Sequence, residues 1–182
     1  MKVTPQEARD LLGRADIVHS AETVTAAIDR VAGEITQRVS ERVPLVLCVM
    51  SGGVIFTGQL LPKLPFPLDF DYLHATRYAQ ETSGGALSWR AAPWTDVKGR
   101  TVLVVDDVLD EGHTLAAIKQ RILSMGAAEC LLAVLVDKDR PEAKPVVADF
   151  VALKAPNRYL FGGGMDVKGA WRNLQAIYAI DC

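Results

Sequence analysis

Three aspartates lie close together in the middle of the chain, directly after a short apolar run. Residues 104–115 read VVDDVLDEGHTL, which places carboxylates at positions 106, 107 and 110. Gly112 follows, and a helical pattern begins at His113 and extends to about Ser124. Acidic side chains beside the start of a helix are suited to binding a polar ligand that carries both hydroxyl groups and an anion.

This spacing favours the binding of a sugar phosphate. The free N–H groups and the dipole at a helix N-terminus attract phosphate, Gly112 lets the backbone approach closely, and Thr114 adds a hydroxyl donor. The adjacent carboxylates of Asp106 and Asp107 repel each other, and ligand hydroxyls or a divalent cation would relieve the repulsion. Mg²⁺ binds oxygen ligands, often one or two carboxylates together with substrate phosphates. The segment therefore predicts a ribose phosphate whose hydroxyls meet the acids.

Three other interpretations of this segment compete. A generic strand-to-helix turn with solvated acids would explain part of the pattern. A receiver domain of a two-component system also has paired acids after a strand, but near the start of the domain, with a phosphate-accepting Asp one strand later. Here the pair is in mid-chain, and the next apolar run leads to Asp137 and Lys138. A Walker phosphate loop is excluded because the chain lacks GxxxxGK followed by Ser or Thr.

Short apolar runs alternate with helical patterns, and this alternation predicts the sheet that holds the acids in place. Residues 101–105 form the clearest buried strand. Similar runs predict further strands at 45–50, 68–73, 130–136, 150–153 and 176–180, with a short helix at 54–61. This order implies an α/β fold with a mainly parallel sheet and helices on both faces. In such sheets, ligands bind beyond the carboxyl ends of the strands.

Two helices are expected before the first strand, within residues 4–40. Thr4, Pro5 and Glu7 form an N-terminal capping signal, and a second helix begins at Ser20. Residues 75–95 lack strong periodicity, so we expect a long functional loop there, in which 86–90 could form half of a hairpin.

The composition is that of an ordinary single-domain globular protein. Of the 182 residues, 49% are hydrophobic and 23% are charged, and the formal net charge of −2 argues against a nucleic-acid partner. Cys48, Cys130 and Cys182 lack the CxxC spacing of zinc sites. The chain shows no signal peptide and no run of about 20 apolar residues, so the sequence predicts a cytoplasmic protein without a membrane partner.

The segment at 104–115 closely resembles the phosphoribosyl-pyrophosphate signature of the type I phosphoribosyltransferases. The remainder of residues 20–180 resembles their hypoxanthine-guanine branch. The resemblance implies a Mg²⁺-dependent enzyme that transfers a phosphoribosyl group from 5-phosphoribosyl 1-diphosphate to hypoxanthine or guanine. It also implies a small hood at about 155–182 with part of the N-terminus, a mobile lid at 75–95, and a homodimer or homotetramer. A xanthine, adenine or pyrimidine enzyme, or a non-catalytic regulator that senses the ribosyl donor, are the alternatives on the same fold.

The resemblance also assigns roles to single residues. Asp106 and Asp107 would meet the ribose hydroxyls directly or through Mg²⁺, and Asp110 would be the acid/base group near N7 of the purine. The 5′-phosphate and ribose would be bound by Asp110, Glu111, Gly112, His113 and Thr114.

The remaining roles fall on the other loops and on the hood. Pyrophosphate would be bound by Ser51, Gly52, Arg77 and Arg172, in a loop that often has a cis peptide, here between Met50 and Ser51. Lys138 would donate to the purine O6, Tyr159 would stack on the base, and backbone groups near Leu160 would contact its edge. Asp166 would hold a second Mg²⁺ through waters.

Two residues depart from the family pattern. Glu111 stands where relatives usually have Thr or Ser, and Ser51 where many have Lys or Arg. A carboxylate at position 111 should point away from phosphate, so we expect a looser 5′-phosphate site.

Overall fold

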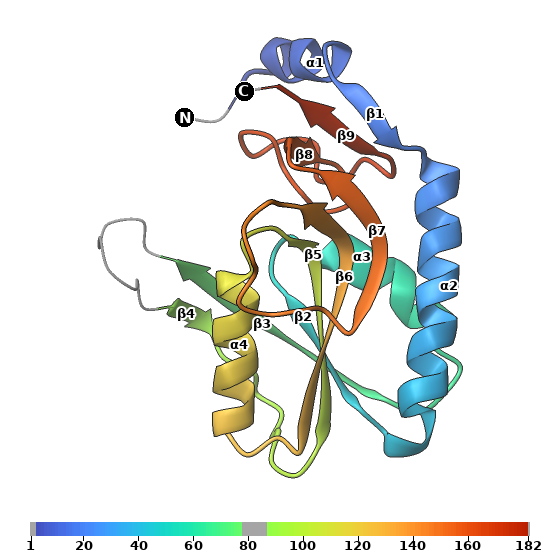
Figure 1. Cartoon of the computed structure of the whole chain (residues 1–182), viewed down its shortest axis with the longest axis vertical. Helices are drawn as coiled ribbons and strands as arrows, with labels where there is room; N and C mark the ends of the chain where they lie inside the picture. The colour runs from blue at the N-terminus through green and yellow to red at the C-terminus, as the bar shows by residue number, and fades with distance from the viewer. Residues whose placement is uncertain (1–2, 78–86, 182) are drawn as a thin grey trace.

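The computed structural model describes residues 3–77 and 87–181, which form alternating helices and strands (Figure 1). The helices are α1 (Pro5–Gly13), α2 (Ala21–Val39), α3 (Val54–Leu60) and α4 (His113–Ser124), with 3-10 turns η1 (Ser40–Arg42) and η2 (Leu61–Lys63). The strands are β1 (Asp16–His19), β2 (Leu45–Val49), β3 (Asp69–Arg77), β4 (Leu87–Ala91), β5 (Thr101–Leu109), β6 (Glu129–Asp139), β7 (Phe150–Pro156), β8 (Tyr159–Phe161) and β9 (Ile177–Ile180).

The main sheet has the strand order β4-β3-β2-β5-β6-β7 within the described residues. All neighbours are parallel except β3 and β4, which form an antiparallel hairpin. Every residue of β2 is buried, as is typical of a strand covered on both faces. The predicted α/β class with a mainly parallel sheet is confirmed.

Helices cover both faces of this sheet. Helices α2 and α3 pack on one face, around a core that includes Ile28, Ile35 and Phe56. Helix α4 packs on the other face, where Ile118 and Ile122 are fully buried. Figure 1 shows α2 and α4 on opposite sides of the sheet. The two apolar layers fix the strand ends, and therefore the loops that follow them.

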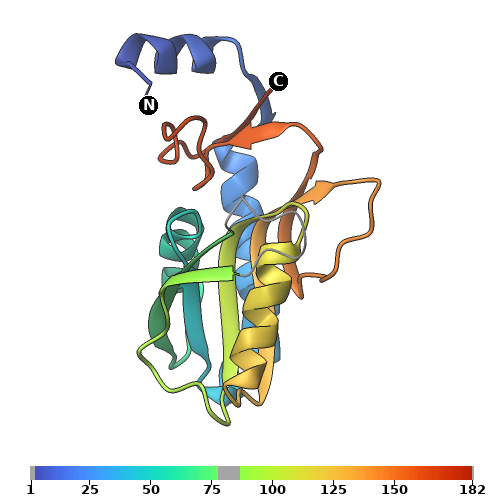
Figure 2. The ribbon, with the colours of Figure 1, turned by 90° about the vertical axis from the view of Figure 1, so that its left-hand side faces the viewer.

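A second, smaller sheet of order β1-β9-β8 lies above the carboxyl ends of the main strands (Figure 2). We call this sheet, helix α1 and the loop between β8 and β9 the hood. The indole of Trp171 donates to the carbonyl of Ala8 at 2.6 Å, which ties the loop to α1. Leu160, Met165 and Ile177 share one core with α2 and α3, so the hood is packed against the main sheet.

The structure differs from the sequence predictions in four places. Strand β5 continues through the acidic residues to Leu109, because its backbone hydrogen bonds to β6 do not depend on side-chain polarity. Strand β3 likewise continues past residue 73 to Arg77, and its final residues pair with β4. Within the loop expected at 75–95, residues 75–77 and 87–91 lie in the antiparallel β3–β4 pair, which confirms the half-hairpin expected at 86–90. Residues 78–86 of the expected mobile lid lie outside the described part. Strands β1 and β8 were not predicted.

No helix in the described residues has the length and apolar character needed to cross a bilayer.

Candidate active site

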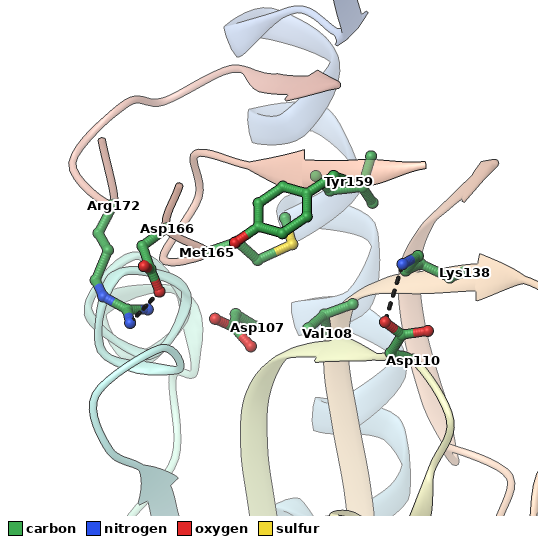
Figure 3. Close-up of a pocket in the computed structure, with 9 residues that line it drawn as sticks. Asp107, Val108, Asp110, Lys138, Tyr159, Met165, Asp166 and Arg172 are labelled. Carbon is green, nitrogen blue, oxygen red and sulfur yellow. Dashed lines mark hydrogen bonds and ion pairs between the residues drawn. The ribbon is translucent and has the colours of Figure 1, made fainter. Parts of the chain in front are cut away.

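Most of the predicted site residues line two adjacent cavities at the carboxyl ends of the main strands, beside the hood. Strands β3 and β5 lie on opposite sides of β2, so the connections diverge at this point, where open α/β sheets bind ligands. A pocket of about 260 Å³ lies there (Figure 3). It is lined by Asp107, Val108, Asp110, Lys138, Tyr159, Leu160, Met165, Asp166 and Arg172. Strand β5, strand β6 and the hood thus contribute to one cavity.

Asp106 and Asp107 are a buried carboxylate pair at the end of β5. Their exposed fractions are only 9% and 8%. Burial and the negative charge of Asp107 raise the pKa of Asp106 well above its usual range. Burial raises the pKa of Asp107 to about 6, against the hydrogen bond with Asp106 and the positive charge of Arg172. Neither carboxylate has an ion-pair partner among the side chains that the structure describes, so the pair would gain from a bound cation or hydroxyl donor.

A second cavity, of about 310 Å³, lies beside the first and is lined by residues 106–115 together with Val49 and Ala75. Helix α4 begins here at His113, and no side chain caps its N-terminus. Gly112 precedes the helix with φ of 83°, a conformation that glycine adopts without strain. The cavity therefore faces the N-terminal end of a helix, where backbone N–H groups favour an anion. Glu111, the unusual residue of the signature, is exposed beside it.

The loop after β2 contacts the acid pair. The peptide between Met50 and Ser51 is cis, as the resemblance implied. A Cβ added to Gly52 would lie 2.0 Å from Oδ2 of Asp107, so only glycine allows this approach. A Cβ on Gly164 of the hood would lie 2.0 Å from the carbonyl oxygen of Gly52. The loop, the acid pair and the hood are therefore in close backbone contact.

Ser51 is exposed in this loop. Arg77 ends β3, and its side chain lies outside the described part of the structure.

Asp166 and Arg172 face the pocket from the hood loop, opposite Asp110 and Lys138 (Figure 3). They form an ion pair with each other. Arg172 also donates to the carbonyl of Gly164 at 2.6 Å, and Asp166 accepts from the backbone N–H of Gly169 at 2.6 Å. This end of the pocket therefore carries one carboxylate and one guanidinium held by backbone contacts.

Asp110 is held between two cations at the other end of the pocket. Lys138 Nζ donates to Oδ2 at 2.9 Å, and Arg140 Nη1 donates to Oδ1 at 2.8 Å. Burial opposes ionisation of Asp110, but the hydrogen bonds and charges of Lys138 and Arg140 outweigh it and lower the pKa of this carboxyl. Asp110 is thus ionised near neutral pH and can accept a proton. The sequence did not predict this ion pair.

The aromatic ring of Tyr159 and the thioether of Met165 form one wall of the pocket, and Val108 lies across from them (Figure 3). Tyr159 is 42% exposed and lines the pocket. Leu160 is buried beneath it. An aromatic and apolar slot with cations and carboxylates at its ends suits a flat heterocycle joined to a charged group.

Sequence reasoning missed three residues here. Arg140 stood in the polar stretch 137–142, which reads as a solvated strand end. Val108 and Met165 are neighbours of predicted site residues in the sequence, but their side chains are apolar and have no group that indicates binding or catalysis. Their neighbours in the two motifs were the only clue that they line the pocket.

The comparisons with known proteins agree with this geometry. A sequence model of the phosphoribosyl transferase domain matches residues 14–167. The hypoxanthine-guanine-xanthine phosphoribosyltransferase of Tritrichomonas foetus is 31% identical over 162 residues, which are 88% of this chain and 88% of that protein. The hypoxanthine-guanine phosphoribosyltransferase of Streptococcus pneumoniae strain R6 is 26% identical over 162 residues, 88% of this chain and 90% of that protein.

Solved structures show the same architecture. A hypoxanthine phosphoribosyltransferase from Staphylococcus aureus has a TM-score of 0.87 at 19% identity and covers 94% of both chains, a likeness of fold. A hypoxanthine-guanine-xanthine phosphoribosyltransferase structure has a TM-score of 0.83 at 28% identity, covering 92% of this chain and 97% of that one. The match to the domain model and the 31% identity to the Tritrichomonas foetus enzyme lead to one conclusion: the chain belongs to the phosphoribosyltransferase family.

Proposed function

We propose that the protein is a purine-salvage enzyme. It transfers the 5-phosphoribosyl group from 5-phosphoribosyl 1-diphosphate to hypoxanthine or guanine, giving IMP or GMP and pyrophosphate. The observation that carries this proposal is the pocket shared by Asp110, Lys138 and Tyr159 at one end and Asp107, Asp166 and Arg172 at the other. The names of the similar proteins support the choice of a 6-oxopurine.

The base would lie against Tyr159 with its 6-oxo group toward Lys138. An ammonium has three donors and no acceptor, so Lys138 favours a carbonyl oxygen and disfavours the amino group of adenine. Asp110 would be the acid/base group near N7: it is ionised at neutral pH, although its lowered pKa makes it a weaker base than a free aspartate. Because Lys138 also donates to Asp110 at 2.9 Å, a base bound at Lys138 would lie beside this carboxylate.

The ribosyl donor would span the two cavities. Its 5′-phosphate would bind at the N-terminus of α4, near Gly112, His113 and Thr114, where the helix has no side-chain cap. Its ribose hydroxyls would meet the carboxylates of Asp106 and Asp107. Arg172 and the loop of Ser51 and Gly52 would bind pyrophosphate. As positive charge grows on the sugar ring, these groups would stabilise the departing anion.

The oxygen ligands present fit a magnesium ion. Asp106 and Asp107 are buried carboxylates with raised pKa values, and such a pair is stabilised by a divalent cation. Within the described residues, no three His, Cys, Asp or Glu side chains form a metal cluster. Mg²⁺ would therefore need oxygens of the ribosyl donor to complete its coordination, and Asp166 could reach a second ion through waters. When bound, the ion would neutralise charge on the pyrophosphate.

A homodimer or homotetramer remains part of the proposal. Phe70 and Tyr72 on β3 are 51% and 43% exposed, and Trp94 after β4 is 92% exposed. Exposed aromatic side chains are typical of surfaces that associate. Light scattering of the purified protein tests this directly: a dimer or larger assembly is expected, and a monomer at micromolar concentration would contradict it.

Turnover of five bases tests the proposed reaction. Hypoxanthine, guanine, xanthine, adenine and uracil are each incubated with 5-phosphoribosyl 1-diphosphate and Mg²⁺, and nucleotide formation is followed by chromatography. We expect hypoxanthine or guanine to be used at least 100-fold more efficiently than adenine or uracil. Turnover of adenine or uracil alone would contradict the assigned role of Lys138. No turnover with any base, together with binding of the donor, would instead favour a regulator.

A further inference from the structure

Lys144 lies in the loop between β6 and β7, outside the residues assigned to the reaction. Its side chain is only 14% exposed. The ammonium donates to the carbonyl oxygen of Leu109 at 2.8 Å and to that of Lys138 at 2.6 Å, and it pairs with the carboxylate of Asp137. An ammonium has three N–H donors, so each of them has its own acceptor.

The three acceptors lie where the main sheet opens into the site. The ladder between β5 and β6 has its last pair at Leu109 and Asp137. Beyond this pair, the backbone of β5 leads to Asp110 and to residues 110–114, which we call the phosphate-binding turn after its proposed role. The backbone of β6 continues to Lys138. Leu109 belongs to this last pair, and Lys138 beyond it still pairs with Ala155 of β7 on its other side. By donating to both carbonyl oxygens, Lys144 bridges β5 and β6 at the point where their ladder ends.

A second contact joins the same loop to the phosphate-binding turn. A Cβ placed on Gly112 would lie 3.3 Å from Cδ of Pro145 and 3.4 Å from Cβ of Lys144. Lys144 and Pro145 therefore pack directly behind the turn that leads into α4. The loop thus contacts the turn by its side-chain packing and the two strand ends by its ammonium.

We propose that Lys144 is a positioning residue that fixes Asp110 and the phosphate-binding turn relative to Lys138. This inference rests on the proposed function, because it assigns Lys144 to the geometry of that reaction. In the proposed reaction, Lys138 on β6 binds the base and the turn after β5 binds the phosphate. The distance between Lys138 and this turn therefore decides whether both substrates fit. A displacement of about 1 Å in such a site can lower the rate about 100-fold.

A structural and a positioning role can be separated by changing the carboxylate as well as the ammonium. Lys144→Met keeps the length of the side chain but leaves Asp137 as an unpaired charge, and we expect the Tm to fall by about 5–10 °C. The double variant Lys144→Met/Asp137→Asn removes that charge, so its Tm should return to within about 3 °C of the wild type. The carbonyls of Leu109 and Lys138 remain unbridged in both variants.

The experiment measures kcat and both KM values for the wild type, the two variants and Lys119→Met. Lys119 on α4 pairs with Asp149 at 3.6 Å and serves as a matched control, a lysine–aspartate pair away from the pocket. We expect kcat/KM for the base and for the donor to fall at least tenfold in the double variant despite its recovered Tm. The control should stay within threefold of the wild type. Activity that returns together with Tm would overturn the proposal.

Amide hydrogen exchange at Ala116, whose N–H donates to the carbonyl oxygen of Gly112 in the turn at 2.9 Å, provides a readout that needs no substrate. The double variant should exchange this amide at least tenfold faster than the wild type, while Lys119→Met should not. Unchanged exchange would overturn the positioning role even if the protein lacked turnover. A wild type that turns over no base would instead refute the proposed function, so the two failures are distinguishable.

Discussion

The buried pair Asp106 and Asp107 should lower the free energy of unfolding of the ligand-free protein at neutral pH. Burial raises the pKa of Asp107 from 3.8 to about 6, so the folded chain must lose this proton against an unfavourable environment at neutral pH. A difference of about two pKa units corresponds to about 3 kcal/mol. Asp107→Asn removes the charge with little change in shape, and should raise the free energy of unfolding at pH 7.5 by about 2–3 kcal/mol in the presence of a chelator.

The sign of the effect follows from proton uptake. Between about pH 4 and pH 6 the folded state holds a proton on Asp107 that the unfolded state has released. The contribution of Asp107 to the free energy of unfolding therefore falls as the pH rises from about 4 to about 6. The gain from Asp107→Asn should be absent near pH 4 and grow up to about pH 6.

Urea denaturation at pH 4, 5.5 and 7.5 measures this gain. Glu41→Gln is the control, because Glu41 is exposed and lies outside the pocket. Its effect on stability should be small at every pH. An Asp107→Asn variant that is less stable than the wild type at pH 7.5, or whose gain does not vary with pH, would refute the reasoning. The same variant should lose turnover, since the stabilised protein would lack a carboxylate that meets ribose and cation.

Three further predictions concern the reaction itself. Asp110→Asn should lower kcat at least tenfold with an unchanged circular dichroism spectrum, because positioned proton transfer supplies about 10²–10⁴-fold in rate; near-normal turnover would reject this role. Glu111→Thr should lower the KM for the ribosyl donor by replacing a carboxylate beside phosphate with a hydroxyl donor, and an unchanged or higher KM in steady-state kinetics would contradict it. Lys138→Met should lower kcat/KM for hypoxanthine by about 10–100-fold relative to adenine, whereas an unchanged ratio in competition assays would exclude its part in base selection.

Much of the main sheet could be predicted from local sequence. Strand β2 is apolar throughout, and β5 and β6 contain the apolar runs 102–105 and 130–136, because strands covered on both faces need no alternation. The capping box of Thr4 and Glu7 is present as predicted. The turn that we propose binds phosphate, residues 110–114, could be singled out because its acids, glycine and helix start are contiguous in the chain.

Two of the three hood strands, β1 and β8, could not be predicted from local sequence, whereas the run at 176–180 predicted β9. Strand β1 has only four residues, and β8 only three, which is too short to show a period. Strand β1 forms by pairing with β9 at the other end of the chain, as Asp16 lies opposite Ala179.

Charge contacts in the site were also hidden in the sequence. Asp110 and Arg140 are 30 residues apart, and nothing in the stretch after β6 distinguishes Arg140 from a solvated arginine. Only the parallel pairing of β5 with β6 brings them together. The resemblance to a known family predicted that Tyr159, Asp166 and Arg172 belong to the site, and all three line the pocket. Their local sequence alone would have indicated ordinary core or surface residues.

A crystal structure of the protein soaked with GMP tests the central claim most directly. The account predicts the 5′-phosphate at the N-terminus of α4, the ribose hydroxyls toward Asp106 and Asp107, and the guanine ring against Tyr159 with its O6 near Lys138. An empty pocket at millimolar GMP, or a nucleotide bound elsewhere on the molecule, would contradict it.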